Sequence, residues 1–377
     1  MRVYFDNAAS TPIRDEVGQF LKSGNAEGFY NPSSVHQEGQ RSRAQISKAR
    51  ELISEILECQ TENILFTSSG TEACNYIISH AIQTYKIKNV LYLETEHSAV
   101  IETVQSTDIN KVKCQLTPDG VINLAEFENR LRSLSGKTLV CVIFINNETG
   151  ILQPIEDISK ICKKYEALFF SDMIQALGKM DVRQAVAYVD FASFASHKIG
   201  GLHGVGLAYM RNSQPVYKQV FGGEQEFGRK AGTENVIGIS AFQIALEACV
   251  SKMDSEHANN LKLHKKLVDG VKKISKNIII PALGSEKDAS ISTLIFPGLK
   301  SENIIIGLDI EGIAVSAGAA CSSGKIGGSH VLRALKYSES DANSAIRVSF
   351  GWHNYPEQVD FFLKTLDNTL QGMNFNF

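Results

Sequence analysis

The sequence lacks several features that would place it at once in a broad class of proteins. Its net charge of −3 gives no broad positive field, so we expect no direct binding to nucleic acid. The seven cysteines are odd in number, scattered and without CxxC spacing, and the nine histidines form no HExxH motif. These absences argue against a disulfide framework and a zinc site, and they favour a reducing cytoplasm.

Two further absences concern membranes. No apolar stretch of the sequence reaches the expected length of a membrane span, and residues 1–6 (MRVYFD) do not resemble a signal peptide. We therefore expect a cytoplasmic protein that makes no contact with a membrane. With 43% apolar and 21% charged residues, the composition is that of an ordinary soluble enzyme. A length of 377 residues predicts two domains around a shared cleft.

Short apolar runs alternate with amphipathic stretches as far as residue 210. We expect strands at residues 63–67, 90–94, 139–146, 167–171, 191–195 and 206–210, and helices at 38–57, 71–87, 124–134 and 155–165. This alternation predicts an α/β fold, a mostly parallel sheet covered by helices. In such sheets the ligand lies beyond the carboxyl ends of the strands, so the residues that follow each strand are the candidates for a site.

The rest of the chain has a different pattern. Two helical patterns follow one another between residues 236 and 276. After them we expect strands at 291–296 and 345–350 and helices at 301–308, 329–336 and 356–373. This order of elements predicts a second, smaller α+β domain.

The segment 67–72, with the sequence TSSGTE, joins an expected strand to an expected helix. Backbone N–H groups and hydroxyls at such a junction can bind an anion at the positive end of the helix. An ordinary N-cap is the simpler interpretation of this segment when it is considered alone.

Three other side chains also follow expected strands. Asp172 ends a buried strand, where a carboxylate needs a cation, such as a protonated pyridine nitrogen, or serves as a helix cap. Lys198 lies between an apolar strand and two glycines, where desolvation would free its amine for Schiff-base chemistry, although most single lysines are solvated surface residues. His97, by itself, is more often structural. As a set, an anion site, an aspartate, a flat ring and a lysine are what pyridoxal phosphate requires.

Cys321 differs from the other six cysteines, which lie in apolar periodic stretches. It lies in the segment 316–329 (SAGAACSSGKIGGS), where glycines and serines leave little to pack. This setting is typical of a nucleophile on a mobile loop that enters a cleft and swings out again. A linker that happens to contain a cysteine is the alternative.

With these motifs in this order and spacing, the chain resembles the cysteine desulfurases of the NifS/IscS-like group. These belong to the class V aminotransferase group of fold-type-I pyridoxal-phosphate enzymes. The resemblance extends from residues 6–12 (DNAASTP) to residues 345–349 (AIRVS). It implies a large cofactor-binding domain at 13–250 with a mostly parallel seven-stranded sheet. Residues 1–12 and 251–377 would form a small domain that carries the Cys321 loop and Arg347.

The resemblance also implies a role for individual residues. Lys198 matches the Schiff-base lysine, His97 the histidine that stacks on the cofactor ring, and Cys321 the persulfide cysteine. The implied cofactor-binding positions are Gly70, Thr71, His97, Asn147, Asp172 (pyridine nitrogen), Gln175 (ring hydroxyl), Ser196, His197, Lys198 and Thr233. Thr233 would reach the phosphate of a neighbouring subunit, which implies a homodimer. Asn147 and Arg347 would orient the carboxylate of the substrate.

The implied activity is that of a sulfurtransferase. The enzyme would convert L-cysteine to L-alanine, hold the sulfur as a persulfide on Cys321, and pass it to an iron–sulfur scaffold or a thiolation enzyme. A selenocysteine lyase or a C–S lyase of the same fold is an alternative, and neither would need Cys321. A catalytically weakened subunit of a sulfur-transfer complex is another.

The chain departs from the family pattern at a few positions. The order Ala195-Ser196 before His197 implies that a phosphate-binding hydroxyl is missing or displaced by one residue, and residues 201–204 read GLHG in place of Gly-Pro-Lys-Gly. Lys230-Ala231 replaces the usual Arg-Ser. The chain ends at Phe377, without the longer tail with which several relatives dock a scaffold protein. These departures concern the cofactor phosphate and the identity of the partner.

Overall fold

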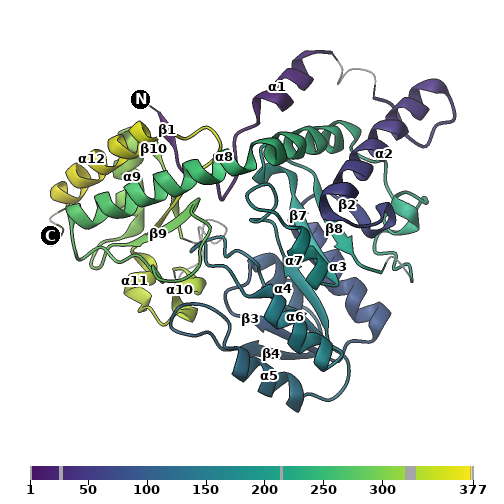
Figure 1. Cartoon of the computed structure of the whole chain (residues 1–377), viewed down its shortest axis with the longest axis horizontal. Coiled ribbons are helices and arrows are strands. Elements are labelled where there is room, and N and C mark those ends of the chain that lie inside the picture. Colours follow the sequence, from purple (N-terminus) through teal and green to yellow (C-terminus); the bar gives the residue numbers. More distant parts are fainter. Residues whose placement is uncertain (1, 25–28, 213–214, 319–327, 374, 376–377) are drawn as a thin grey trace.

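The computed structural model describes residues 2–24, 29–212, 215–318, 328–373 and 375 (Figure 1). Cys321, the predicted persulfide cysteine, therefore lies outside the described residues.

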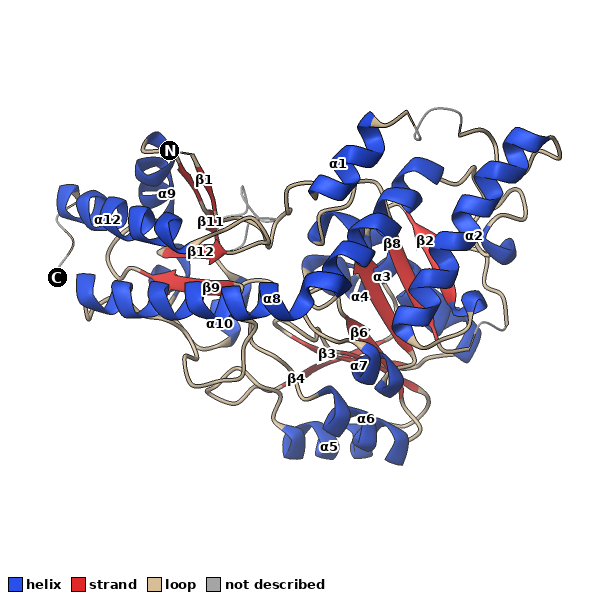
Figure 2. Cartoon of the chain, turned by 45° about the horizontal axis from the view of Figure 1, so that its top comes forward, coloured by secondary structure: helices blue, strands red, loops and turns tan. Residues whose placement is uncertain are grey.

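A seven-stranded sheet forms the larger part of the molecule (Figure 2). Its strand order is β2-β8-β7-β6-β5-β3-β4, and all pairs are parallel except those that β8 makes with β2 and β7. The strands are β2 (Ile64–Thr67), β3 (Asn89–Leu93), β4 (Asn110–Cys114), β5 (Thr138–Cys141), β6 (Leu168–Asp172), β7 (Phe191–Ala195) and β8 (Gly206–Met210). The mostly parallel seven-stranded sheet is thus confirmed.

Helices cover both faces of this sheet, because successive side chains of a strand point to opposite faces. In β3, Leu91 and Leu93 belong to one apolar core, whereas Val90 and Tyr92 belong to the other. The first core receives side chains from α2 (Gln37–Leu57), α5 (Leu124–Ser133), α6 (Ile155–Lys164) and α7 (Arg183–Tyr188). The second receives them from α3 (Gly70–Tyr85) and α4 (Ser98–Gln105). We call this part the large-sheet region.

A third apolar core is built by both ends of the chain, which lie near each other in Figure 1. β1 (Val3–Tyr4) pairs with β10 (Ile313–Ala314), and β11 (Ser316–Ala317), β12 (Ala345–Ser349) and β9 (Ile291–Ile295) form an antiparallel sheet. The helices here are α9 (Ser301–Ile310), α10 (His330–Ala334), α11 (Glu339–Asn343) and α12 (Pro356–Gly372). This small-sheet region has the expected mixture of helices and strands, and the predicted domain limits stay a prediction.

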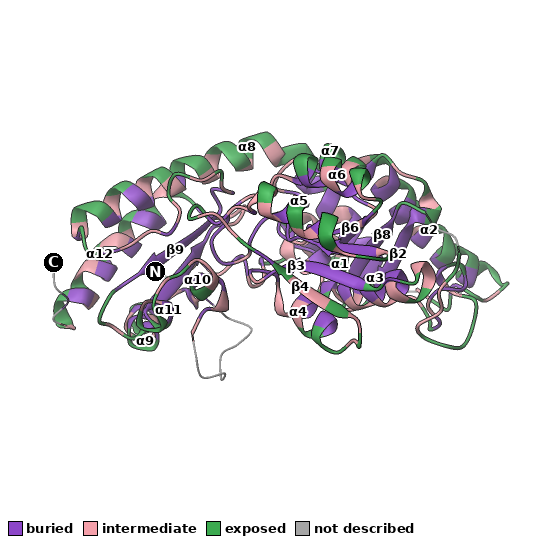
Figure 3. Ribbon diagram, turned by 90° about the horizontal axis from the view of Figure 1, so that it is seen from below, coloured by how far each residue is buried: buried purple, intermediate pink, exposed green. Residues whose placement is uncertain are grey.

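α8 (Val236–Ile274) joins the two regions as one helix of 39 residues, whereas the sequence predicted two helical patterns in succession. Its first turns pack into the large-sheet region and its last turns into the small-sheet core. The middle of α8 is largely exposed (Figure 3). α1 (Asp15–Lys22) lies beside it.

α8 also corrects the expectation that no stretch could span a membrane. It is long and apolar enough to do so, with a mean hydropathy of 1.4 in a window that is 61% buried inside the protein. Core helices of soluble proteins meet the same criterion, and this burial accounts for the composition of α8.

Candidate active site

A cavity of about 940 Å³ lies at the carboxyl ends of the parallel strands, facing the small-sheet region. The predicted residues that line it are Gly70, Thr71, His97, Asn147, Asp172, Gln175, His197, Lys198 and Arg347. They come from segments that follow β2, β3, β5, β6 and β7, and from β12. The cavity therefore brings together the groups that were predicted separately from the ends of strands, and the role of each residue stays a prediction.

Lys198 ends the 3₁₀ turn η2 (Ser196–Lys198), which directly follows β7. Its Nζ donates hydrogen bonds to Ala8 O at 2.6 Å and to Ala9 O at 2.7 Å. Gly200, just beyond the lysine, has a φ of +85°, and a Cβ there would lie 2.6 Å from Arg14 Cγ. The lysine is thus held by the N-terminal segment, for which the sequence had suggested no role.

Asp172 is the last residue of β6 and is buried. Burial raises its pKa to about 6, although hydrogen bonds from Ile174 N and Ser193 and the charge of Lys198 oppose the rise. A buried carboxylate of this kind is stabilised by a cation placed beside it. Its chemistry therefore fits a protonated pyridine nitrogen.

Gln175 has both ends of its amide engaged. Nε2 donates to Ala8 O at 3.0 Å, and Oε1 accepts from Lys179 Nζ at 3.0 Å. Lys179 also forms an ion pair with Asp288 at 3.1 Å. Because an ammonium group only donates, Lys179 fixes which end of the Gln175 amide is the oxygen.

His97 is the N-cap of α4, and its Nδ1 accepts a hydrogen bond from Ala99 N at 3.1 Å. Burial, followed by the positive charges of Lys198, His330 and Arg347, lowers its pKa to about 4. At neutral pH the ring is therefore uncharged and carries its proton on Nε2. A flat neutral ring at the cavity wall is suited to stacking on a planar ligand.

The start of α3 forms another wall of the cavity. Ser69 caps the helix by accepting a hydrogen bond from Glu72 N, and Gly70 and Thr71 follow it. A Cβ on Gly70 would lie 2.3 Å from Ile174 Cδ1, so a larger residue at this position would require the Ile174 side chain to move. Backbone N–H groups at such a helix start bind anions.

His197 lies beside the helix start. Its ring stacks on His203 with centroids 5.1 Å apart, and Ser10 Oγ lies 3.4 Å from its Nδ1. Burial, then the charges of Lys198 and His203, lowers its pKa to about 4. His203 belongs to the GLHG segment that departs from the family pattern, so this stacked pair is a consequence of that departure.

Two residues predicted to bind the cofactor do not line the cavity. Ser196 is fully buried, and among the described residues no partner hydrogen-bonds to its Oγ. A Cβ on Gly201 would lie 2.1 Å from this Oγ, whereas Ala195 lines the cavity. The displaced hydroxyl thus faces Gly201, and the geometry gives no support to a role for Ser196. Thr233 is exposed away from the cavity, as a residue that serves a neighbouring subunit would be.

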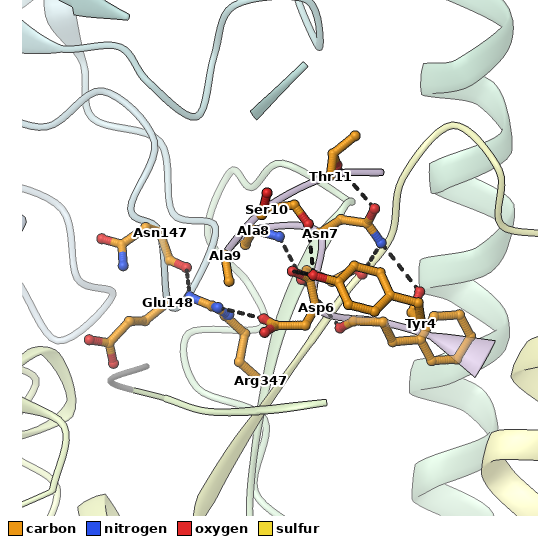
Figure 4. A network of polar contacts seen from close by, with 12 residues as sticks. Tyr4, Asp6, Asn7, Ala8, Ala9, Ser10, Thr11, Asn147, Glu148 and Arg347 are labelled. Atoms are coloured by element: carbon orange, nitrogen blue, oxygen red, sulfur yellow. Dashed lines mark hydrogen bonds and ion pairs between the residues drawn. The ribbon is translucent and has the colours of Figure 1, made fainter. Parts of the chain in front are cut away.

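Arg347 and its surroundings include two acids that the sequence did not single out (Figure 4). The guanidinium donates to Asn147 O at 2.9 Å and to Asp6 Oδ1 at 2.8 Å. Glu148 is buried beside it and accepts a hydrogen bond from Ser329 Oγ. Burial raises the pKa of Glu148 to about 7, against the effects of Ser329 and Arg347. In the sequence, only the position of Glu148 after an apolar strand could have indicated that this acid lies at the site.

Comparison with known proteins gives consistent results. Residues 3–362 match the model of the aminotransferase class-V family. The cysteine desulfurase IscS of Dictyoglomus turgidum is 32% identical over 98% of this chain and 95% of that protein. IscS of Methanosarcina thermophila is 31% identical over 98% of this chain and 92% of that protein.

Two solved structures share the fold of the whole chain. The NifS-like protein of Rickettsia africae superimposes with a TM-score of 0.91 at 28% identity, over 98% of this chain and all of that one (100%). A second NifS-like protein gives a TM-score of 0.90 at 32% identity, over 99% and 100% of the two chains.

Proposed function

The chain belongs to the class-V aminotransferase family and, within it, to the cysteine desulfurases, and we propose that Cys321 receives the sulfur that the enzyme removes from L-cysteine. One observation carries the proposal. A single cavity is lined by a lysine, a buried aspartate, a neutral histidine and a buried arginine, which come from segments far apart in the sequence. These are Lys198, Asp172, His97 and Arg347.

The residues of the cavity fit pyridoxal phosphate, the cofactor on which this family depends. Lys198 would hold it covalently through Nζ, and Asp172, whose raised pKa favours a cationic partner, would pair with the pyridine nitrogen. The remaining contacts would come from Gly70, Thr71 and His197 to the phosphate, Gln175 to the ring hydroxyl, and His97 and Asn147 to the ring. The bound cofactor supplies an electron sink for the Cα electrons of an amino acid.

Arg347 and Asn147 would bind the carboxylate of L-cysteine, which fixes its sulfur relative to the cavity wall at Gly328. The thiolate of Cys321 attacks this sulfur. An S–S bond forms while the C–S bond breaks, and the carbon keeps the electron pair, takes up a proton and leaves in L-alanine. L-cysteine and one enzyme thiol thus give L-alanine and one enzyme persulfide.

The other cysteines are poor nucleophiles, which supports the choice of Cys321. Cys59 is half-buried, and burial raises its pKa to about 12. The remaining five are buried, and burial raises the pKa of each: Cys74, Cys114, Cys141, Cys162 and Cys249. Sulfur attack requires a thiolate, and a thiol with such a pKa is protonated at neutral pH.

We also propose a homodimer in which Thr233 reaches the cofactor phosphate of the partner subunit. The segment before Thr233 exposes Phe221 (82% exposed) and Phe227 (48%), and Val35 nearby in the fold is 86% exposed. Gln225, between the two phenylalanines, donates a hydrogen bond through Nε2 to Ser33 Oγ at 3.5 Å, so the segments that carry these apolar side chains lie next to each other. Exposed apolar surface of this extent is typical of an interface between subunits.

The enzyme would work in the cytoplasm and pass its sulfur to an acceptor protein, either an iron–sulfur scaffold or a thiolation enzyme. The test begins with incubation of the purified enzyme with L-cysteine, alkylation and peptide mapping by mass spectrometry. We expect a persulfide on Cys321 and on no other cysteine.

Cys321→Ser should release no alanine when a thiol acceptor is present, and Cys59→Ser is the matched control that should react as the unmodified enzyme does. Alanine release by Cys321→Ser at the normal rate would mean that the sulfur leaves without this cysteine, as in a C–S or selenocysteine lyase. A purified protein without the visible absorbance of the bound cofactor would instead indicate a weakened subunit.

A further inference from the structure

Arg347 is a buried cation whose counter-ion comes from the N-terminal segment. Its side chain is 2% exposed, and its Nη2 donates to Asp6 Oδ1 at 2.8 Å. No described residue accepts a hydrogen bond from its Nε, which is also buried. A buried guanidinium that loses its counter-ion is strongly destabilising. Asp6 therefore compensates the charge of Arg347 (Figure 4).

The backbone around Asp6 is fixed to the strand that carries Arg347. Asn7 Nδ2 donates to Ser349 O at 2.9 Å, and Ala8 N donates to Ser349 Oγ at 2.8 Å. The Asp6 side chain is 21% exposed, so water can solvate the carboxylate when it leaves Arg347. Arg347 is thus held in place, whereas the Asp6 carboxylate can exchange its bond to Arg347 for hydrogen bonds to water.

The same segment also holds the lysine of the site. Ala8 O and Ala9 O both accept hydrogen bonds from Lys198 Nζ, and Ala8 O accepts one from Gln175. Residues 6–9 therefore contact, at the same time, the groups proposed for the substrate carboxylate and for the cofactor. A lysine amine bound to the cofactor could not make both bonds to the carbonyl oxygens.

A carboxylate binds a guanidinium most tightly through two parallel hydrogen bonds along one edge of the fork. The two edges of Arg347 that can act in this way, Nε–Nη2 and Nη1–Nη2, share Nη2, to which the Asp6 carboxylate is bonded. Two carboxylates beside one guanidinium repel each other. A substrate carboxylate therefore competes with Asp6.

We propose that Asp6 is a positioning residue that takes the place of the substrate carboxylate on Arg347 until substrate arrives. The proposal rests on the role of Arg347 proposed above. Asp6 stabilises the charge of Arg347 before substrate binds and lowers the affinity of the site for every ligand with a carboxylate.

The test uses Asp6→Asn and L-alanine, which has the amine and carboxylate of the substrate without its sulfur. We expect the cofactor-loaded variant to bind L-alanine about tenfold more tightly in calorimetric titration, a change that corresponds to about 1.4 kcal/mol. The KM for L-cysteine should fall by a similar factor while kcat changes less. The cofactor-free variant should unfold at a lower temperature than the unmodified protein. Equal or weaker binding of L-alanine would overturn the proposal.

The control is Asp309→Asn, which removes a carboxylate that pairs with Arg2 at 2.6 Å on the exposed surface. Its affinity for L-alanine should not change. Arg347→Lys distinguishes a failure of the role proposed for Arg347 from a failure of the role proposed for Asp6. If this variant binds L-alanine as well as the unmodified enzyme does, the role of Arg347 itself is wrong; if it binds weakly and Asp6→Asn binds no more tightly, only the role of Asp6 is wrong.

A crystal structure of the unmodified enzyme with L-alanine tests the proposal even if Asp6→Asn does not fold. The alanine carboxylate should be bonded to Arg347 Nη2, and Asp6 should have moved away from it. An Asp6–Arg347 bond that persists at 2.8 Å in this complex would contradict the proposal.

Discussion

Replacement of Glu148 by glutamine should stabilise the protein in alkaline solution and leave its stability in acid unchanged. Glu148 is 2% exposed, its Oε2 accepts from Ser329 Oγ, and its Oε1 lies 4.0 Å from His330 Nδ1. Glutamine has nearly the same shape and keeps an oxygen that can accept the hydrogen bond from Ser329. The substitution therefore removes the buried charge and little else.

The magnitude follows from the pKa of Glu148, which burial raises from 4.5 to about 7. The folded protein binds this proton more tightly than the unfolded chain does. The stability that the proton provides is complete below pH 4.5 and is lost as the pH rises through 7. The difference of about 2.5 in pKa corresponds to about 3 kcal/mol.

Thermal unfolding of Glu148→Gln and the unmodified protein between pH 4.5 and 8.5 provides the measurement. An unfolding entropy of about 2.1 cal/mol/K per residue converts 3 kcal/mol into an increase of roughly 4 °C in Tm for this chain at pH 8. The increase should disappear near pH 4.5. Glu311→Gln, which removes a charge from an exposed position, should have no effect at any pH. A variant that is no more stable than the unmodified protein at pH 8 would refute the reasoning.

Three further predictions concern the cofactor and the substrate. Lys198→Ala should lose the covalent link to pyridoxal phosphate; borohydride reduction and peptide mapping test this, and a pyridoxyl group on another lysine of the unmodified enzyme would contradict it. Arg347→Lys keeps the positive charge but loses the two parallel N–H donors of the guanidinium, so the KM for L-cysteine should rise at least about tenfold while the visible absorbance of the cofactor persists. An unchanged KM would count against the proposed role of Arg347. Asp172, with a pKa raised to about 6, should make cofactor binding to the cofactor-free protein weaker at pH 5 than at pH 7.5. Asp172→Asn should bind about tenfold more weakly at pH 7.5 and lose this dependence on pH, as a fluorescence titration would measure.

The sequence predicts most of the central sheet well because six of its strands are buried and consist largely of apolar residues. β4 is the strand that it missed. This strand lies at the edge of the sheet, where Lys111 and Lys113 interrupt the apolar pattern. α4 was also missed, because its eight residues are too few to show a helical period.

In the site, Asp172 and Lys198 could be predicted because Asp172 is the last residue of its strand and Lys198 comes three residues after the end of another. The partners of Lys198 and Arg347 could not be, since they come from residues that are distant in sequence: Asp6 and Arg347 are 341 positions apart. The raised pKa of Glu148 is likewise a property of burial, and a motif such as NNETG does not specify burial.

The continuity of α8 has a mechanical consequence. Residues 250–262 of this helix contact neither apolar core, so roughly 20 Å of exposed helix connects the two regions of the protein. A helix resists bending, because bending stretches its backbone hydrogen bonds. The continuous helix α8 therefore restricts the rotation of the two regions relative to each other. Within this exposed stretch, Glu256 forms two hydrogen bonds of 2.7 Å with Arg14, whose Nε donates to Ile199 O. Through Arg14, Glu256 thus connects the exposed stretch of α8 to the backbone of Ile199, the residue next to Lys198.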